Sequence, residues 1–419
     1  MLNSIPSQSS SLQDWLSYLE RIHPKTIDMG LERVAKVAQS LGYIDSPSKI
    51  ILVAGTNGKG TTCRLLEALL LEQGYSVGTY ASPHLVRYNE RVRINGQELD
   101  DQYHIDAFNE IEQGRGEISL SYFEYGTLGG LSIFKRFAVD YVVLEVGLGG
   151  RFDATNIVNP FATVITTIDL DHKDFLGDTR EKVGYEKAGI FRKGIPAIVG
   201  DLNIPLTVTD YGNEIQADLI LSGTDFEFIQ KESSFIWTYL TQAWEFDLPA
   251  IPAQNAATAF TVLATLGLLP DEATSRRVLK ELQVEGRFQR LSEQPLVYTD
   301  VAHNPESARY LAGKLREFSN KGFKIHALVA MLSDKDKTNA ILPLVDVVNR
   351  WTVAKLEGPR TEPAKVLADL VQEHTSRTVS EADSVTDALK NILPTMNNDE
   401  LLIVFGSFYT VAEAIEYWQ

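Results

Sequence analysis

The sequence predicts an α/β protein: a P-loop-type, doubly wound N-terminal domain followed by a smaller, Rossmann-like α/β domain. Three observations favour this class. Short apolar runs of strand length alternate with helix-period segments over most of the 419 residues. The run 49–54 is rich in β-branched residues and ends at Gly55, as buried parallel strands do. A second alternating series begins near Leu296, after a break in the pattern.

Local signals justify each further element of the first domain. A helix is expected over 59–73 with Gly74 at its end, and strands are expected over 76–81, 141–146, 161–168 and 195–199. Short alternating segments from about 219 to 248 predict a small antiparallel sheet, and two helices should follow over 254–268 and 271–282.

The second domain should open with a strand over 296–300, followed by a helix that begins at Pro305 with Asn304 as its cap. Further strands are expected over 325–331, 351–355 and 401–405, with another helix after Thr361. We place the boundary near Gly286, so that the predicted domains are 1–286 and 287–419.

Composition excludes several classes of protein. The apolar fraction of 44% excludes wholesale disorder, and the single cysteine, Cys63, excludes an intrachain disulfide. The net charge of −17 argues against an extended surface for nucleic acid or anionic membrane. No stretch approaches about eighteen consecutive apolar residues, so no membrane span is expected. We therefore expect a soluble, cytoplasmic protein that binds neither nucleic acid nor a membrane.

The strongest local signal is the Gly-rich turn 55–62, between a predicted strand and a predicted helix. Glycines let backbone N–H groups point at phosphate oxygens, and a helix N-terminus favours negative charge. Lys59 can reach the β- and γ-phosphates, and Thr61 or Thr62 can contact phosphate or its magnesium. The Walker pattern is matched imperfectly, because Val53 occupies its first glycine position and Gly60 follows the lysine. A plain strand–helix turn is the alternative interpretation.

Three more polar residues, Ser82, Glu145 and His172, lie at or just beyond the carboxyl ends of predicted strands. Ligands of open α/β sheets bind beyond these carboxyl ends, so the three side chains and the phosphate loop suggest magnesium held with nucleotide phosphate. Histidine is less typical of magnesium, which prefers oxygen. The alternatives are a salt bridge for Glu145 and a structural role for His172.

With these motifs the chain resembles the folylpolyglutamate synthases and dihydrofolate synthases of the Mur ligase family. The resemblance is carried by segments in the family's order along nearly the whole chain: 28–33, 55–62, 81–87, 122–125, 145–156, 170–172, 186–190, 286–288, 300–305, 356–360 and 405–407. It implies a Mur-ligase-like fold and an ATP- and Mg²⁺-dependent amide ligase, which we expect to be a monomer. Such an enzyme phosphorylates a carboxylate to an acyl phosphate, which the amino group of L-glutamate attacks, releasing ADP and phosphate.

The resemblance also implies the substrates, dihydropteroate and folates together with L-glutamate. The segment 122–127 is similar to the version found in bifunctional bacterial enzymes, so both activities are expected. A monofunctional folylpolyglutamate synthase, and a P-loop NTPase or phosphotransferase, stay open as alternatives.

Roles are implied residue by residue. The family's phosphate loop falls on Thr56, Asn57, Gly58, Lys59, Gly60 and Thr61, and further ATP contacts fall on Asn255, Arg287, Asp300 and His303. The magnesium ligands fall on Ser82, Glu145 and His172; the last two, with Lys59 and the family's carbamylated lysine at Lys187, form the catalytic set. The pterin would contact Asp28, Met29, Gly30, Leu31, Ser121, Tyr122, Phe123, Glu124, Phe152, Asp153 and Ala154.

Plainer structural roles compete with several of these assignments. Arg287 could be a solvated linker arginine, and Asp300 and His303 could be capping and core residues. The aromatic residues near 122 could belong to the core instead of stacking on a pterin. Lys187 could be a surface lysine paired with its neighbour, Glu186.

Overall fold

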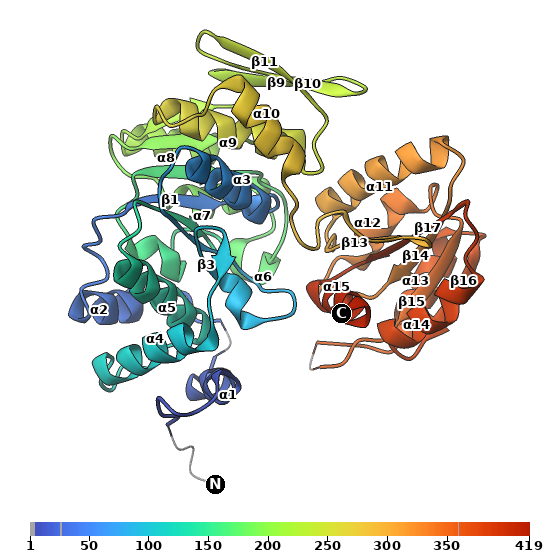
Figure 1. The fold of residues 1–419 in the computed structure, drawn as a ribbon, viewed down its shortest axis with the longest axis horizontal. Coiled ribbons are helices and arrows are strands. Elements are labelled where there is room, and N and C mark those ends of the chain that lie inside the picture. Colours follow the sequence, from blue (N-terminus) through green and yellow to red (C-terminus); the bar gives the residue numbers. More distant parts are fainter. Residues whose placement is uncertain (1–4, 26, 359) are drawn as a thin grey trace. The chain divides into compact units, whose positions relative to one another are not determined.

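The computed structural model describes residues 5–25, 27–358 and 360–419 (Figure 1). It divides into two compact units. The first comprises the residues up to His84 and Tyr88–Leu282, and the second comprises Leu85–Arg87 and Gln283–Gln419. Each unit is a helix-covered sheet, so the predicted α/β class is confirmed. Pro359, within the resembling segment 356–360, lies outside the described residues.

An eight-stranded sheet forms the centre of the first unit, among the residues described. In spatial order its strands are β4 (Gln97–Glu98), β3 (Val92–Ile94), β2 (Val77–Tyr80), β5 (Tyr141–Glu145), β1 (Lys49–Ala54), β6 (Ala162–Ile165), β7 (Pro196–Val199) and β8 (Asp218–Leu221). The strands from β2 to β8 are parallel, as predicted, whereas β3 and β4 add an antiparallel edge. This edge was not predicted, because strands of three and two residues show no period.

Helices cover both faces of this sheet. They are α1 (Leu12–Ile22), α2 (Glu32–Ser40), α3 (Lys59–Glu72), α4 (Asp101–Gly114), α5 (Tyr122–Phe137), α6 (Lys173–Leu176), α7 (Arg180–Ala188), α8 (Leu206–Glu214), α9 (Ala253–Thr265) and α10 (Glu272–Glu281). The helix α3 packs with α9 and α10, whereas α2, α4 and α5 pack together (Figure 1). In β1, Leu52 joins the core cluster shared with α4 and α5, and its neighbours Ile51 and Val53 are equally buried. Successive strand residues point to opposite faces, so both faces of β1 are covered.

The predicted small antiparallel sheet is present. Its strands are β9 (Phe226–Gln230), β10 (Ser234–Tyr239) and β11 (Gln242–Asp247), with β10 in the middle. The start of the segment expected in this sheet instead forms β8, which extends the large sheet beside β7.

The second unit has a six-stranded sheet among its described residues. In spatial order the strands are β12 (Gln289–Glu293), β13 (Leu296–Asp300), β17 (Glu400–Phe405), β14 (Lys324–Val329), β15 (Arg350–Ala354) and β16 (Thr378–Ala382). The helices are α11 (Pro305–Asn320), α12 (Lys337–Ile341), α13 (Ala364–His374), α14 (Val385–Ile392) and α15 (Phe408–Trp418). Only β12 is antiparallel to its neighbour within this described sheet. Ile403 and Val404 of β17 join two separate core clusters, so this sheet is also covered on both faces.

Candidate active site

Four neighbouring parallel strands of the first unit, β2, β5, β1 and β6, carry the predicted site residues at their carboxyl ends. Ser82 follows β2, Glu145 ends β5, the turn 55–62 follows β1, and His172 lies in the loop after β6. Because carboxyl ends of parallel strands meet at one edge, the fold brings these four sequence-distant features to the same edge of the sheet.

Within the phosphate loop, Gly58 caps α3 in the left-handed region with φ +81° and without a side-chain hydrogen bond to the helix. A Cβ atom on Gly58 would lie 2.5 Å from Oδ1 of Asn255, so only glycine fits. The Nδ2 of Asn255 donates to the hydroxyl of Thr61 over 2.7 Å, and that hydroxyl donates to the Gly58 carbonyl over 2.9 Å. The predicted ATP contact Asn255, at the start of α9, therefore lies against the loop.

The Lys59 ammonium folds back over the same loop. Its Nζ donates to the carbonyl oxygens of Gly55 and Thr56 over 3.0 and 3.3 Å. The Thr56 hydroxyl exchanges 3.0 Å hydrogen bonds with the backbone of Asp169, on the segment that leads to His172. A cation, a glycine-capped helix start and a braced backbone together fit phosphate oxygens.

Two of the three predicted magnesium ligands are in contact. The backbone N–H of Ser82 donates to Oε2 of Glu145 over 3.2 Å, and a Cβ atom on Gly60 would lie 3.8 Å from the same oxygen. The Glu145 carboxylate is thus buried beside the first turn of α3. A hydroxyl and a carboxylate next to a phosphate loop are oxygen donors of the kind that magnesium takes.

His172, the third predicted ligand, directly precedes α6 with φ +48°, and its side chain is 38% exposed. Among the residues that the structure describes, no group of three or more His, Cys, Asp or Glu side chains could hold a metal. The predicted ligand set, Ser82, Glu145 and His172, includes only two residues of these types, so it could not form such a group. The assignment of His172 as a magnesium ligand stays a prediction.

Lys187 is buried, with 2% of its surface exposed, so the surface-lysine alternative is wrong. The end of its helix, α7, is fixed to the loop after β5. The backbone N–H of Arg151 donates to the carbonyl of Glu186 over 2.8 Å, and Nδ2 of Asn156 donates to the carbonyl of Gly189 over 3.1 Å. A Cβ atom on Gly150 would lie 2.8 Å from the Lys187 carbonyl, which explains a glycine at that point of close approach.

The three predicted pterin-binding segments lie in the first unit, and two of them are joined through the backbone. The N–H of Gly30 donates to the carbonyl of Phe152 over 3.2 Å. The adjacent Asp153 carboxyl is buried and accepts hydrogen bonds from Leu148 N–H, over 2.8 Å, and from the Thr155 hydroxyl, over 2.6 Å. Burial raises its pKa above the ordinary value, although these hydrogen bonds oppose the shift. Ala154 is buried beside it, whereas Met29 and Leu31 are half-buried.

The third segment starts α5. Ser121 and Glu124 form a capping box, in which Glu124 Oε2 accepts from Ser121 N–H over 2.7 Å and Ser121 Oγ accepts from Glu124 N–H over 3.3 Å. Helix capping accounts for both residues. Tyr122 and Phe123 are partly exposed. A Cβ atom on Gly147 would lie 2.5 Å from the Phe123 ring, so this ring packs against the Gly147 backbone at a position that leaves no room for a side chain.

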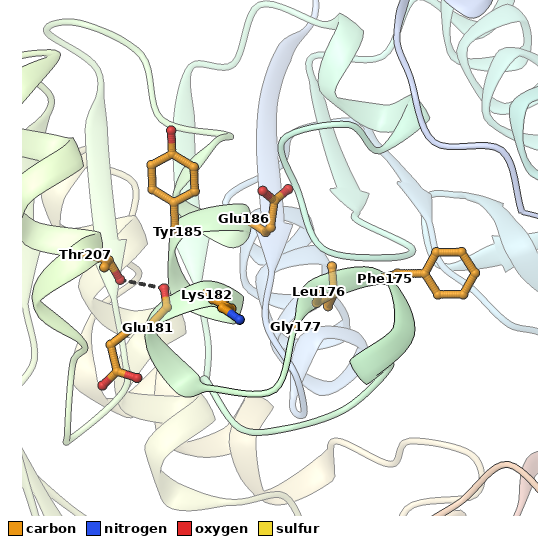
Figure 2. A pocket seen from close by; sticks show the side chains of 8 residues that line it. All are labelled: Phe175, Leu176, Gly177, Glu181, Lys182, Tyr185, Glu186 and Thr207. Carbon is orange, nitrogen blue, oxygen red and sulfur yellow. Dashed lines mark hydrogen bonds between the residues drawn. The ribbon is translucent and has the colours of Figure 1, made fainter.

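One pocket, of about 410 Å³, opens beside this region between α6, α7 and α8 (Figure 2). Its lining consists of Phe175, Leu176, Gly177, Glu181, Lys182, Tyr185, Glu186 and Thr207. Figure 2 shows the Thr207 hydroxyl, which donates to the Glu181 carbonyl over 2.7 Å and so ties α8 to α7. Burial raises the pKa of Glu186, against the opposing charge of Arg151. No predicted site residue lines this pocket, although Glu186 directly precedes Lys187.

In the second unit the structure brings the predicted residues Arg287, Asp300 and His303 close together. The Asp300 carboxylate accepts from the N–H groups of Phe288 and Ala302, each over 2.8 Å. Burial raises its pKa, and the charge of Arg287 opposes that shift. The Arg287 guanidinium lies 5.3 Å from the centre of the Phe408 ring, and the centre of the His303 ring lies 6.3 Å from that same ring centre. Their roles toward ATP stay predictions.

Comparisons with known proteins identify the family. A model of the Mur ligase middle domain matches residues 53–265, and a model of the Mur ligase glutamate ligase domain matches 286–408. The chain belongs to the Mur ligase family. It is 46% identical over 417 residues to the dihydrofolate synthase/folylpolyglutamate synthase of Escherichia coli strain K12, covering 99% of this chain and 97% of that one.

Solved structures of this Mur ligase family are equally similar. The E. coli FolC in complex with DHPP and ADP has a TM-score of 0.94 at 45% identity, covering 98% of each chain. A bifunctional folylpolyglutamate synthase/dihydrofolate synthase with Mn, AMPPNP and L-glutamate bound has a TM-score of 0.91 at 45% identity, again covering 98% of each chain.

Two residues that brace the site, Arg33 and Asn156, received no role from the sequence. Both lie inside segments that carry the family resemblance, 28–33 and 145–156. Their contacts cross 91 and 33 positions of the chain, respectively, and no local pattern reports such distances.

Proposed function

We propose that this chain is an ATP-dependent ligase that joins L-glutamate to dihydropteroate, giving dihydrofolate, and to folates, extending their glutamyl chain. One observation carries the proposal: the Gly-rich turn after β1 lies beside the Glu145 carboxylate, since a Cβ atom on Gly60 would lie 3.8 Å from its Oε2. Relatives that match 98% of this chain have been solved in complex with DHPP and ADP, and with Mn, AMPPNP and L-glutamate.

The residues suit this chemistry because both reacting partners, a carboxylate and ATP, are anions. Transfer of the γ-phosphoryl group to the carboxylate oxygen needs positive charge where negative charge accumulates. Lys59 supplies an ammonium over the loop, and the glycine-capped start of α3 adds the helix dipole. Magnesium, when bound, would neutralise phosphate charge, and Ser82, Glu145 and His172 would hold it. The amino group of L-glutamate then attacks the acyl phosphate and displaces phosphate.

The rest of the ATP and pterin assignments belong to the same proposal. Asn255 would support the loop from α9, and Arg287, Asp300 and His303 would contribute further ATP contacts. The partly exposed Tyr122 and Phe123 rings have the faces needed to stack on a pterin.

The reaction is tested by incubating the chain with ATP, Mg²⁺, L-glutamate and dihydropteroate while phosphate release and dihydrofolate are followed. Phosphate release that requires both acceptors, with dihydrofolate as product, is expected. If tetrahydrofolate alone supports turnover, the chain is a monofunctional folylpolyglutamate synthase. Phosphate release that ignores both acceptors would instead indicate a P-loop NTPase.

We also propose that Lys187 works as a carbamate. It is 2% exposed and lies on a helix whose end is fixed to the loop after Glu145, a predicted magnesium ligand. A carbamate supplies an anionic oxygen instead of a cation near magnesium. Lys187→Arg should lose activity, whereas Lys182→Arg, an exposed residue of the same helix paired with Asp178, should keep it. A wild-type rate in Lys187→Arg, or no carbamate signal from ¹³C-bicarbonate, would contradict the role.

We further propose a monomer that works in the cytoplasm. No helix in the described part of the chain is long and apolar enough to cross a membrane. Light scattering at micromolar concentration should return a mass near 46.6 kDa, and twice that mass would contradict a monomer.

A further inference from the structure

Arg33, the second residue of α2, bridges two carboxylates from distant parts of the chain. Its Nη1 lies 2.8 Å from Oδ2 of Asp28, and its Nη2 lies 3.1 Å from Oε1 of Glu124. Nη2 also donates to the Asp28 carbonyl over 3.2 Å. Asp28 and Glu124 are both predicted pterin-binding residues, yet both carboxylates face this one guanidinium. Besides their other contacts, both carboxylates therefore bind Arg33, and Arg33 joins their segments.

The bridge is built to be rigid. Glu124 is only 2% exposed, and its other oxygen is already committed to the capping box with Ser121. A buried carboxylate needs a cation, and a planar guanidinium can bond two carboxylates at fixed angles. Lysine, with a point charge on a flexible stem, cannot reproduce that geometry. The Nε of Arg33 is buried without a hydrogen bond, so the two terminal nitrogens carry the whole contact.

Asp28 is anchored from other directions as well. It accepts from Lys25 over 3.1 Å and from His23 over 3.2 Å. The Lys25 hydrogen bond lowers the pKa of Asp28 more than burial raises it, and the charge of Arg33 adds to the lowering. Loss of Arg33 would leave Asp28 with two partners, whereas Glu124 would lose the ion pair that links it to the 28–31 segment.

The bridge extends to the pterin-binding segment 152–154. Gly30, two residues from Asp28, donates to the Phe152 carbonyl over 3.2 Å. On the other side, Tyr125 in the first turn of α5 bonds to the Glu112 carboxylate, which pairs with Arg115. The start of α5 is thus fixed to α4, and Arg33 is the ion-pair link from it to the segments around Gly30 and Phe152.

We propose that Arg33 is a positioning residue that holds the three pterin-binding segments in one arrangement before substrate arrives. The inference rests on the proposed function, because it takes a pterin as the ligand of these segments. A preorganised site binds more tightly, because the entropy cost of ordering the segments does not reduce the free energy of binding. Arg33 therefore raises the affinity for the pterin-bearing substrate and leaves the phosphate loop, fixed separately through Asp169 and Asn255, unaffected.

The test compares Arg33→Met and Arg33→Lys with Arg93→Met as a matched control. Arg93 also faces a glutamate that is 2% exposed, Glu67, and its Nε is likewise buried without a hydrogen bond. It lies on β3 and belongs to none of the pterin-binding segments. For each protein, KM is measured for dihydropteroate, ATP and L-glutamate, dihydropteroate binding without ATP is measured by calorimetry, and thermal unfolding is followed in parallel.

The expected result is a rise in KM and Kd for dihydropteroate of roughly ten-fold or more in both Arg33 variants. KM for ATP and L-glutamate should stay within about two-fold, and Arg93→Met should show no change selective for dihydropteroate. Arg33→Lys should recover at most a fraction of the affinity. Unchanged dihydropteroate affinity in both variants would overturn the proposal, and so would a parallel loss of all three affinities. The wild-type assay, run first, tests the proposed function by itself, so the two failures are distinguishable.

Discussion

Two strand-to-helix turns, one in each unit, differ in how the first N–H groups of the helix are capped. In the first unit β1 leads into α3 through Gly58, a left-handed glycine that supplies no side-chain cap, and the first turn of α3 has no acidic residue. In the second unit β13 leads into α11 through Asn304. That residue forms a capping box with Ser307 over 3.0 Å, with Pro305 and the acidic Glu306 directly after it.

The difference shows which turn is suited to an anion. At α11 the Asn304 side chain accepts a hydrogen bond from the backbone, and the negative charge of Glu306 interacts favourably with the positive end of the helix dipole. At α3 a lysine takes the place of the acid, and the glycine removes the steric obstacle to a phosphate. We therefore expect the cap of α3 to bind phosphate and the cap of α11, Asn304, to stabilise its helix, whereas the proposed ATP contacts Asp300 and His303 precede that cap.

Removal of the cation at the first turn should have the largest effect. Lys59→Ala is expected to lower kcat of ligation by about 10²-fold or more, because the ammonium stabilises the phosphoryl group during transfer. Far-ultraviolet circular dichroism should stay unchanged. Lys231→Ala, which breaks an exposed 2.9 Å ion pair with Glu245, serves as the control and should keep its rate. A near wild-type rate with saturating ATP would remove Lys59 from the mechanism.

A methyl group at Gly58 tests the shape of the same turn. Gly58→Ala must keep φ near +81° and place its Cβ against the Asn255 side chain, so the loop should shift. We expect KM for ATP to rise roughly ten-fold and stability to fall by about 1 kcal/mol or more. Gly74→Ala, also at φ +81° but with open space around the added Cβ, should share the strain and keep the ATP affinity. Equal KM values for ATP in the two variants would mean that the close approach of Asn255 is irrelevant.

The capping residue of the second turn should matter for stability instead. Asn304→Ala removes the side chain that accepts from Ser307 N–H, which typically costs about 1 kcal/mol of folding free energy. Urea denaturation should show that loss, while kcat falls far less than in Lys59→Ala. If kcat of Asn304→Ala drops as steeply as that of Lys59→Ala, the two turns are not as different as their caps indicate.

The smallest expected effect concerns pH. Burial, with a smaller contribution from the Arg350 charge, lowers the pKa of His326 in the second unit to about 4. The unfolded chain, with an ordinary histidine pKa of about 6.5, binds a proton first as pH falls. The stabilising contribution is complete above about pH 6.5 and is lost as pH falls toward 4.

Between pH 7 and 5.5 the wild type should lose about 1 kcal/mol more unfolding free energy than His326→Gln, measured by urea denaturation. Glutamine can still hydrogen-bond to Thr352, which lies 2.9 Å from the histidine ring nitrogen. Parallel pH dependence of the two proteins would show that His326 titrates normally.

Much of the fold could be predicted because strong local signals mark it. The apolar runs of β1 and β13 have the bounds expected from sequence, and Asn304 and Pro305 cap and open α11 as predicted. The strands β3, β4, β12 and β16, at or next to sheet edges, were missed, because short or irregular strands there have weak patterns. β12 even shifts register between Arg290 and Ser292.

Candidate site residues could be named from the sequence, but their arrangement could not. The motifs mark the strand ends, whereas the strand order β2-β5-β1-β6, which makes those ends neighbours, is a property of the folded sheet. The bridge from Arg33 to Glu124 spans 91 positions, and the helix end that carries Lys187 contacts the distant residues Gly150 and Asn156. Contacts of this range have no periodic trace in a single sequence.

The central claim is that the turn after β1 transfers phosphate from ATP to a substrate carboxylate. It is tested most directly with dihydropteroate whose carboxylate carries ¹⁸O, in the presence of ATP, Mg²⁺ and L-glutamate. Attack of glutamate on an acyl phosphate leaves one carboxylate oxygen on the departing phosphate. The released phosphate is therefore predicted to contain one ¹⁸O atom per dihydrofolate formed. Unlabelled phosphate, released in step with dihydrofolate, would contradict the claim.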